Sequence, residues 1–147
     1  MRSHASCAEA FAVPTAIIIT LQTIHRAYEA WSRRDIEALL ELVHPDAVAR
    51  PILGANIGVS VYHGRDGLRE WFRDLHQEWE AFETRVKRID EHGGSALLTI
   101  DVHARGRASG VVIEGELYHL VELRDGLIIR LEAFRDRDAA VAALEAT

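Results

Sequence analysis

The chain of 147 residues is poor in cysteine and in long apolar runs, and each shortage excludes a class of protein. The single cysteine, Cys7, rules out an internal disulfide and a cysteine metal site, and is compatible with a reducing cytoplasm, the location we expect. The apolar segment TAIIITL at residues 15–21 is too short to span a membrane. A glutamate and a proline ahead of it interrupt any apolar core of a signal peptide. We therefore predict a disordered lead over residues 1–14, followed by one domain over residues 15–147.

Basic residues are too dispersed to form a nucleic-acid surface. The 17 lysines and arginines are scattered among 23 aspartates and glutamates, so the net charge is −6 and no basic stripe is present. The eight histidines show no HxxxH-type spacing, so we predict no metal site and no cofactor. The length and the hydrophobic fraction of 48% are those of a soluble globular domain with a substantial core.

The sequence does contain helical patterns in its first half. Apolar residues at spacings of three and four predict a helix over residues 15–33. A second, short helix is expected from an N-cap at Asp35 to about His44, where the following proline disfavours helix. The apolar stripe from Leu68 to Trp79 predicts a third helix.

Strand patterns dominate the second half. Two short strands are expected at DAVARPIL (46–53) and GVSVY (58–62), and long strands at 82–91, 95–106, 111–123 and 127–135. The segment DAAVAALEA (138–146) predicts a short terminal helix. Helices that precede a mostly antiparallel sheet indicate an α+β domain.

Side-chain alternation places His119 in an otherwise apolar row of its strand. The row contains Leu117, Val121 and Leu123 and, if Gly106 pairs with Val111, shares a face with the apolar row of strand 95–106. A three-residue RDG turn that pairs Leu123 with Leu127 would add Leu127, Ile129, Leu131 and Ala133 to this face. We therefore predict a pocket on the concave face, with its wall formed by His119, Tyr28, Trp31, Trp71, Leu98, Ile100, Leu117, Val121 and Ala133.

Each polar or aromatic candidate has a structural and a functional interpretation. His119 is either a core histidine bonded to a backbone carbonyl, or a donor to a ligand oxygen or a general base. Tyr28, Trp31 and Trp71 suit a core more than a ligand cage. Arg50 either extends from a strand edge into water, or lies at the pocket mouth, where it would suit a carboxylate or enolate ligand.

Four segments resemble one protein family along residues 20–145. In order along the chain they are YEAWSRRDIEALLELVHPDAV, YHGRDGLREWF, RGRASGV and LRDGLIIRLEAFRDRDAAVAAL. Their order and spacing resemble those of SnoaL-like polyketide cyclases in the nuclear-transport-factor-2-like superfamily, which also holds ketosteroid isomerases and limonene epoxide hydrolases. The resemblance implies a cone-shaped α+β barrel, in which a curved sheet wraps three helices around an apolar pocket open at one end.

The chain matches only some of the catalytic residues that the resemblance implies for each of these enzyme groups. His119 matches the cyclase histidine, while Ala133 replaces the cyclase aspartate. Asp101 matches one hydrolase acid, although its strand row predicts an outward side chain, and Thr99 and Ala133 replace that family's other residues. Arg50 stands where ketosteroid isomerases have their base. Their tyrosine falls one position before Tyr28, and their acidic oxyanion donor falls near His119.

Three functions remain open from these residues. We expect first a domain that binds a small, largely apolar molecule in the pocket, with catalysis undemonstrated. The alternative is a cyclase- or isomerase-type enzyme that moves a proton next to a carbonyl, with His119, Arg50 and Asp101 as the candidate catalytic residues. The third possibility is an interaction domain whose cone is filled by its own side chains.

The outward row of the sheet predicts a homodimer. Large apolar side chains are interleaved there with charged ones, as in a two-fold interface. These apolar residues are Val112, Tyr118, Leu120, Ile128 and Phe134. The superfamily resemblance implies pairing through the same face, with Tyr118 and Phe134 central, and the alternative is a monomer with a mottled surface.

Overall fold

The computed structural model describes residues 13–52 and 61–146. The helices are α2 (Thr15–Ser32), α3 (Ile36–Leu40), α4 (Gly64–Glu78) and α5 (Arg137–Glu145). The strands are β1 (Val43–Arg50), β2 (Tyr62–His63), β3 (Trp79–His92), β4 (Ser95–Gly106), β5 (Val112–Arg124) and β6 (Leu127–Phe134). The predicted lead and most of the predicted strand 58–62 lie outside the described residues.

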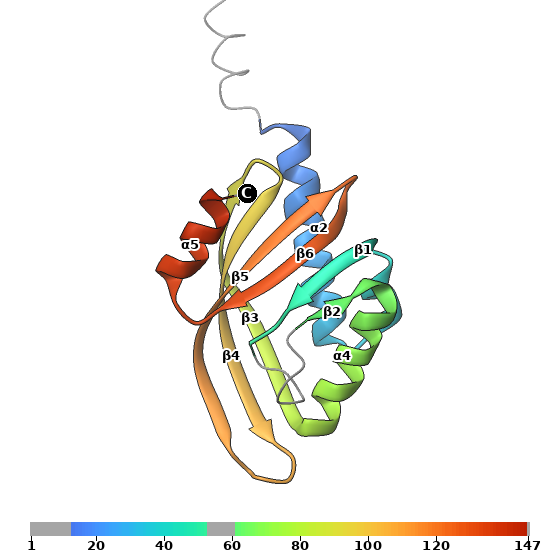
Figure 1. Ribbon diagram of the computed structural model, residues 1–147, viewed down its shortest axis with the longest axis vertical. Coiled ribbons are helices and arrows are strands. Elements are labelled where there is room, and N and C mark those ends of the chain that lie inside the picture. Colours follow the sequence, from blue (N-terminus) through green and yellow to red (C-terminus); the bar gives the residue numbers. More distant parts are fainter. Residues whose placement is uncertain (1–12, 53–60, 147) are drawn as a thin grey trace, which may run out of the picture.

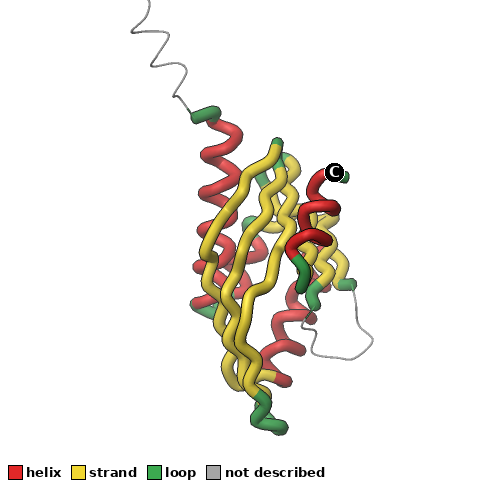
Figure 2. Tube along the Cα trace, turned by 90° about the vertical axis from the view of Figure 1, so that its left-hand side faces the viewer, coloured by secondary structure: helices red, strands yellow, loops and turns green. Residues whose placement is uncertain are grey.

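One curved sheet organises the molecule, with the strand order β2-β1-β6-β5-β4-β3 (Figure 1). β1 runs parallel to β6, and the other neighbouring strands are antiparallel. α4 contacts both edge strands, β2 and β3, so it closes the curved sheet. Figure 2 shows α2 on one face of the long strands and α5 on the other. This architecture confirms the α+β prediction. No helix in the described part of the chain is long and apolar enough to cross a membrane.

The first two helices follow the sequence pattern, and the second ends earlier than predicted. Asp35 caps α3, because its carboxylate accepts a hydrogen bond from the backbone N–H of Ala38 at 3.1 Å. The helix nevertheless ends at Leu40, and β1 already begins at Val43. The reason is tertiary pairing, since the Leu42 carbonyl accepts a hydrogen bond from the Ile128 N–H of β6 at 2.9 Å.

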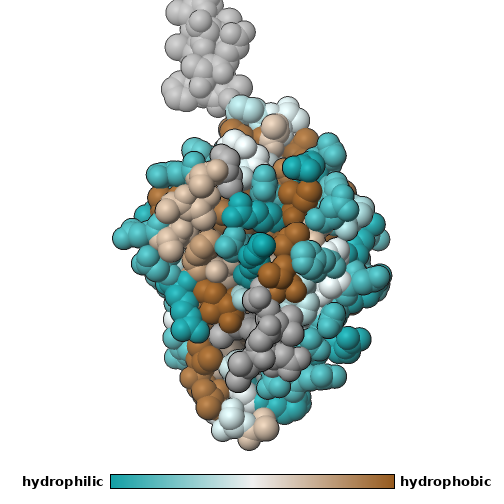
Figure 3. Space-filling view, in the orientation of Figure 1, coloured by the Kyte–Doolittle hydropathy of each residue, from teal (hydrophilic) through white to brown (hydrophobic). Residues whose placement is uncertain are grey.

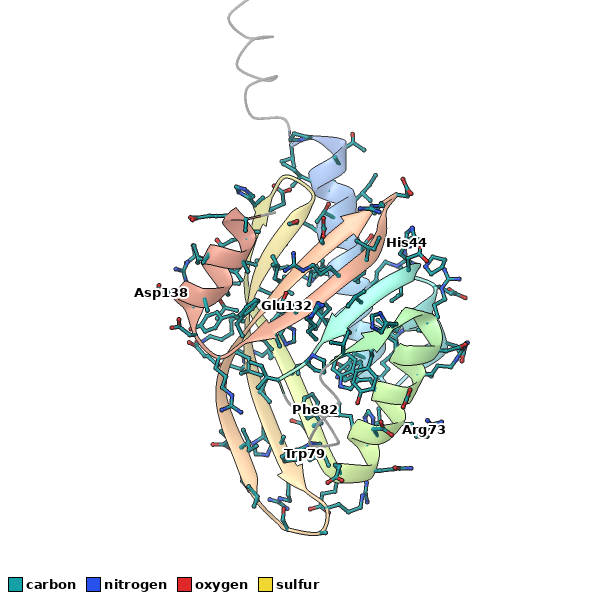
Figure 4. All side chains as sticks on the ribbon, viewed as in Figure 1. His44, Arg73, Trp79, Phe82, Glu132 and Asp138 are labelled. Carbon is teal, nitrogen blue, oxygen red and sulfur yellow. The ribbon has the colours of Figure 1, made fainter. Side chains whose placement is uncertain are left out.

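Trp79 also differs from its prediction, because it begins β3 instead of ending a helix. It pairs with Gly106, at the far end of the long β3–β4 hairpin. Figure 4 shows Trp79 and Phe82 on β3 beside the end of α4. The helical spacing of Trp79 is therefore accidental, and both aromatic residues contribute to the inner core.

The β4–β5 register agrees with the prediction from the apolar rows. Arg105 pairs with Val112 at the hairpin end, and Leu98 pairs with His119 further along. The inward row of β4 is almost completely buried, with Leu98 and Ile100 at 0% exposure. His119 therefore lies on the concave face, beneath the helices.

The β5–β6 turn differs from its prediction. Asp125 and Gly126 have φ values of 54° and 76°, which form a two-residue turn of the kind that Asp-Gly favours. Leu123 therefore pairs with Ile128 instead of Leu127. A bulge between Glu122 and Leu123 then returns Leu131 and Ala133 to the face predicted for them, although His119 pairs with Ala133 and not with Leu131 as the predicted register implied. Ile128 consequently belongs to the buried inner core and not to the outward row, where it was predicted.

The outward face of the sheet carries a second, smaller core beneath α5. Its buried members are Leu97, Leu120, Ala140 and Leu144, and Tyr118 and Phe134 pack against them. Leu120 has 0% exposure. The prediction of Leu120 in an interface between two chains is therefore wrong, because the chain's own C-terminal helix covers it. Figure 3 shows hydrophilic and hydrophobic residues intermixed on this side of the molecule.

Candidate functional site

Tyr28 and His119 meet on the concave side of the sheet. Tyr28 comes from the middle of α2, and His119 comes from the inward row of β5. The Tyr28 Oη and the His119 Nδ1 are 2.5 Å apart, and the two ring planes are inclined by 29°. A distance this short is that of a strong hydrogen bond. The partner of His119 is thus a side chain, in place of the backbone carbonyl that a core histidine was expected to find.

Burial keeps both members of this pair uncharged at neutral pH. It lowers the pKa of His119 from 6.5 to about 4, and it raises the pKa of Tyr28 above its ordinary value. Two neutral arrangements satisfy the hydrogen bond: the Tyr28 O–H donates to Nδ1, or the Nδ1–H donates to Oη. The first leaves a proton on Nε2, and the second leaves a lone pair there. The pair can therefore offer His119 Nε2 as a donor or as an acceptor.

Three chambers lie along the concave face, and neighbouring chambers share lining residues. The inner chamber has a volume of about 70 Å³, the middle chamber about 20 Å³ and the outer chamber about 320 Å³. The inner chamber is lined by Ala27, Tyr28, Trp31, Leu39, Val43, Leu68, Trp71, Phe82, Thr84, Val121, Ile128 and Leu131. The middle chamber is lined by Pro51, Ile52, Trp71, Phe82, Thr84, Val102, Leu117, His119, Leu131 and Ala133.

The Tyr28–His119 pair lies where the inner and middle chambers meet. Tyr28 lines the inner chamber and His119 lines the middle one, and the two chambers share Trp71, Phe82, Thr84 and Leu131. The accessible wall of the inner chamber is apolar. A molecule that occupies both chambers would therefore contact an apolar wall first and one polar pair at the junction.

Comparison with known proteins identifies the family. The model of the SnoaL-like domain matches residues 24–131, which is 108 of the 147 residues. The chain belongs to the SnoaL-like domain family. None of the curated protein sequences compared with it matches. The family resemblance predicted from the sequence segments is thereby confirmed.

Solved structures share the fold of this SnoaL-like domain at low sequence identity. An NTF2-like protein of unknown function from Burkholderia pseudomallei has a TM-score of 0.72 at 19% identity, over 86% of this chain and 97% of that chain. TerC, co-crystallised with polyporic acid, has a TM-score of 0.71 at 21% identity, over 86% and 98%. A ketosteroid isomerase-like protein from Catenulispora acidiphila, in complex with trimethylamine, has a TM-score of 0.67 at 12% identity, over 82% and 89%.

Two buried donors at the junction of the chambers lack a partner in the described part of the SnoaL-like domain. They are the Nε1 of Trp71 and the Oγ1 of Thr84, and both residues line the inner and middle chambers. The Trp71 ring packs against Trp31, with centroids 4.8 Å apart. An unpaired buried donor costs about 1–3 kcal/mol.

The structure brings most of the predicted pocket residues together. Tyr28, Trp31, Trp71 and Val121 line the inner chamber, and Leu117, His119 and Ala133 line the middle one. Leu98 and Ile100 lie behind the wall, completely buried in the core.

The other two candidate catalytic residues lie away from the Tyr28–His119 pair. Arg50 is exposed at the end of β1 and is not among the residues that line the three chambers. Asp101 lies on the outward face, where its carboxylate is 3.7 Å from the Lys87 Nζ. Its strand row predicted this outward side chain, because Ile100 and Val102 point inward, and the position leaves its predicted catalytic role without support.

Sequence analysis missed several contributors to the site, and three of them are polar or aromatic. Phe82 and Thr84 are alternate members of the inward row of β3, and Arg135 lines the outer chamber. No local pattern singled out Arg135, because it follows the last residue of β6 and its position depends on the path of the chain there. Among residues 13–52 and 61–146, no group of three or more His, Cys, Asp or Glu side chains is placed to hold a metal ion.

Proposed function

We propose that this SnoaL-like domain binds a small, largely apolar molecule in the inner and middle chambers. The observation that carries the proposal is the Tyr28–His119 hydrogen bond at the junction of two chambers with mostly apolar walls. Ligand sites typically combine an apolar wall with a few polar groups that fix orientation. TerC, which shares the fold, was crystallised with a small organic molecule, and this supports the same use of the pocket.

The dimensions of the chambers favour a slim ligand. The inner chamber of about 70 Å³ is smaller than the cavity of about 150 Å³ that holds benzene in another protein. The middle chamber is narrower still, at about 20 Å³. An alkyl chain is the thinnest apolar group that could pass from one to the other, so we propose a ligand with a chain-like apolar part.

A proton-transfer enzyme of the cyclase or isomerase type is the second candidate. It is favoured by the two neutral arrangements of the Tyr28–His119 pair, one of which leaves a lone pair on Nε2 to accept a proton from a carbon next to a carbonyl. Two observations weigh against it. A histidine with a pKa of about 4 is a weak base at neutral pH, and Ala133 is opposite His119, where an acid would orient the ring.

Fluorescence quenching tests the binding proposal directly. The probe is 8-bromooctan-1-ol, whose bromine quenches tryptophan at short range; Trp31 and Trp71 both line the inner chamber. We expect saturable quenching in the native protein. The variant Ala133→Leu fills the middle chamber and should weaken binding at least about tenfold, because the chamber has no room for the added carbons.

A matched histidine provides the control. His103→Gln changes a residue on the outward face that is bonded to Glu114, and it should leave quenching unchanged. His119→Gln should weaken it. Absence of saturable quenching at millimolar probe, in a protein whose thermal melt shows a native fold, would contradict the proposal and favour a domain whose interior is filled by its own side chains.

A further inference from the structure

The outer chamber adjoins the middle one. It shares Ile52, Val102 and Leu117 with the middle chamber. Gly115, in the inward row of β5, leaves this part of the wall without a side chain, and a Cβ added there would meet nothing within 4 Å. The three chambers therefore adjoin one another in order, from the apolar one near Trp31 to the one at Arg135, whose side chain is exposed.

Arg135 is the cationic residue that lines the outer chamber. It follows Phe134, the last residue of β6, and is two positions beyond Ala133, which pairs with His119. Arg135 thus lies just beyond the end of the strand that carries Ala133.

No hydrogen bond or ion pair engages the Arg135 guanidinium in the described part of the chain, and the neighbouring acids have partners of their own. Glu114 lines the same chamber, but its Oε1 is 2.8 Å from the His103 Nδ1 on the outward face. The Asp136 carboxylate caps α5 by accepting a hydrogen bond from the Ala139 N–H at 3.0 Å. Glu132 is paired with Arg130 at 2.7 Å. The positive charge at the outer chamber is therefore available to a ligand.

We propose that Arg135 binds a carboxylate at the outer end of the ligand, so that the domain takes slim amphipathic acids with the apolar chain inward and the carboxylate at the mouth. This inference rests on the proposed binding function and names its ligand class. A guanidinium matches a carboxylate with two parallel N–H donors, which gives orientation as well as attraction. Arg50 was predicted from the sequence for this role, but it does not line the chambers.

Two probes that differ only in the head group test the proposal. They are 8-bromooctanoate and 8-bromooctan-1-ol, both followed by tryptophan quenching at pH 7.5 and low salt. We expect the acid to bind about tenfold more tightly than the alcohol, as for a charge-assisted pair. Added salt should reduce this preference. Arg135→Gln should bring the acid to the affinity of the alcohol and leave the alcohol unchanged.

Arg50→Gln serves as the matched control and should keep the preference for the acid. Equal binding of the two probes by the native protein would overturn the carboxylate assignment while leaving the binding function intact. Binding of neither probe would overturn both proposals. Loss of the preference in Arg50→Gln, with the preference retained in Arg135→Gln, would overturn the assignment to Arg135. Arg135 is exposed, so its variant should melt like the native protein.

Discussion

The two faces of the sheet differ in how their polar side chains are paired: the outward face has exposed ion pairs, and the inward face has a buried hydrogen bond between uncharged groups. On the outward face, charged residues pair across strands in contact with water: the Lys87 Nζ is 2.6 Å from Glu116 and 3.7 Å from Asp101. On the inward face, the side chains of Tyr28 and His119 hydrogen-bond to each other, away from the charged residues of the described chain. Consecutive residues of β5 lie on the two different faces. Tyr118 and Leu120 face α5, and His119 between them faces the chambers.

The two faces also differ in the ionisation state of their polar side chains, and this decides which part of a ligand each could bind. The Glu116 carboxylate raises the pKa of Lys87, so the outward charges keep their ionised forms. Burial instead forces His119 and Tyr28 to be neutral. A polar pair that must remain neutral amid apolar walls is suited to orient an uncharged part of a ligand, whereas a charged head group fits the outer chamber near Arg135.

The largest expected effect concerns the part of the outward face that α5 covers. Leu120→Ala should lower the free energy of unfolding by about 2–5 kcal/mol, because it opens a cavity in the cluster with Leu97, Ala140 and Leu144. Chemical denaturation measures this change. The matched variant Val112→Ala, in the same outward row but 49% exposed, should change stability by less than about 0.5 kcal/mol.

Light scattering on the same samples tests the homodimer, which remains a prediction. If the native protein is a dimer and Leu120→Ala is a monomer of unchanged stability, then Leu120 contacts a second chain and the cover by α5 is not its main environment. A large loss of stability without a change in mass would agree with the cluster described above.

The buried imidazole on the inward face should make the free energy of unfolding depend on pH. Because the folded pKa of His119 is lowered to about 4 from an ordinary 6.5, the unfolded chain binds a proton more readily between these values. His119 therefore contributes stability that is fully present above about pH 6.5 and is lost as the pH falls toward 4, up to roughly 3 kcal/mol. Chemical denaturation at intervals between pH 7.5 and 4 measures it.

His119→Gln should remove this part of the pH dependence, since glutamine does not titrate in this range. His103→Gln is the control, because its ring lies on the outward face beside Glu114. Equal pH profiles for the native protein and His119→Gln would contradict the burial of the imidazole.

A somewhat smaller effect is expected when one member of the pair is removed. Tyr28→Phe leaves the His119 Nδ1 without its hydrogen-bond partner and should cost about 1–3 kcal/mol of unfolding free energy. The double variant Tyr28→Phe with His119→Leu removes both polar groups, so it should recover part of this loss. A double-mutant cycle with no coupling between the two positions would show that their hydrogen bond contributes nothing in solution.

The sequence was sufficient for those parts of the fold that depend on local pattern. The β4–β5 register follows from the apolar rows, and the N-cap at Asp35 follows from its side chain. The length of the β5–β6 turn could not be predicted from local pattern, because the RDG segment suits both a two-residue and a three-residue loop. A bulge between Glu122 and Leu123 keeps Ala133 on the face of His119, as predicted, although the turn and the pairing both differ from the predicted register.

The site was predictable in its strand half and not in its helix half. Alternation alone places His119 inward, but the partner of His119 depends on how α2 is rotated against β5, and no local pattern encodes this angle. For the same reason, the sequence alone could not decide whether Arg50 or Arg135 lines the pocket. Both are arginines near a strand end, and only the curvature of the sheet and the path of the chain after Phe134 decide which one lines the chamber.

The smallest effect is expected at the charges of the outward face. Lys87→Gln removes the ion pairs with Glu116 and Asp101, and these side chains are 40–44% exposed. Exposed pairs gain little over hydration, so chemical denaturation should detect no loss of stability, and whatever difference appears at low salt should vanish at high salt. The coupling between Tyr28 and His119 should instead be insensitive to salt, because neither group is charged. A loss for Lys87→Gln that matched the loss for Tyr28→Phe, and persisted in salt, would contradict the contrast between the two faces.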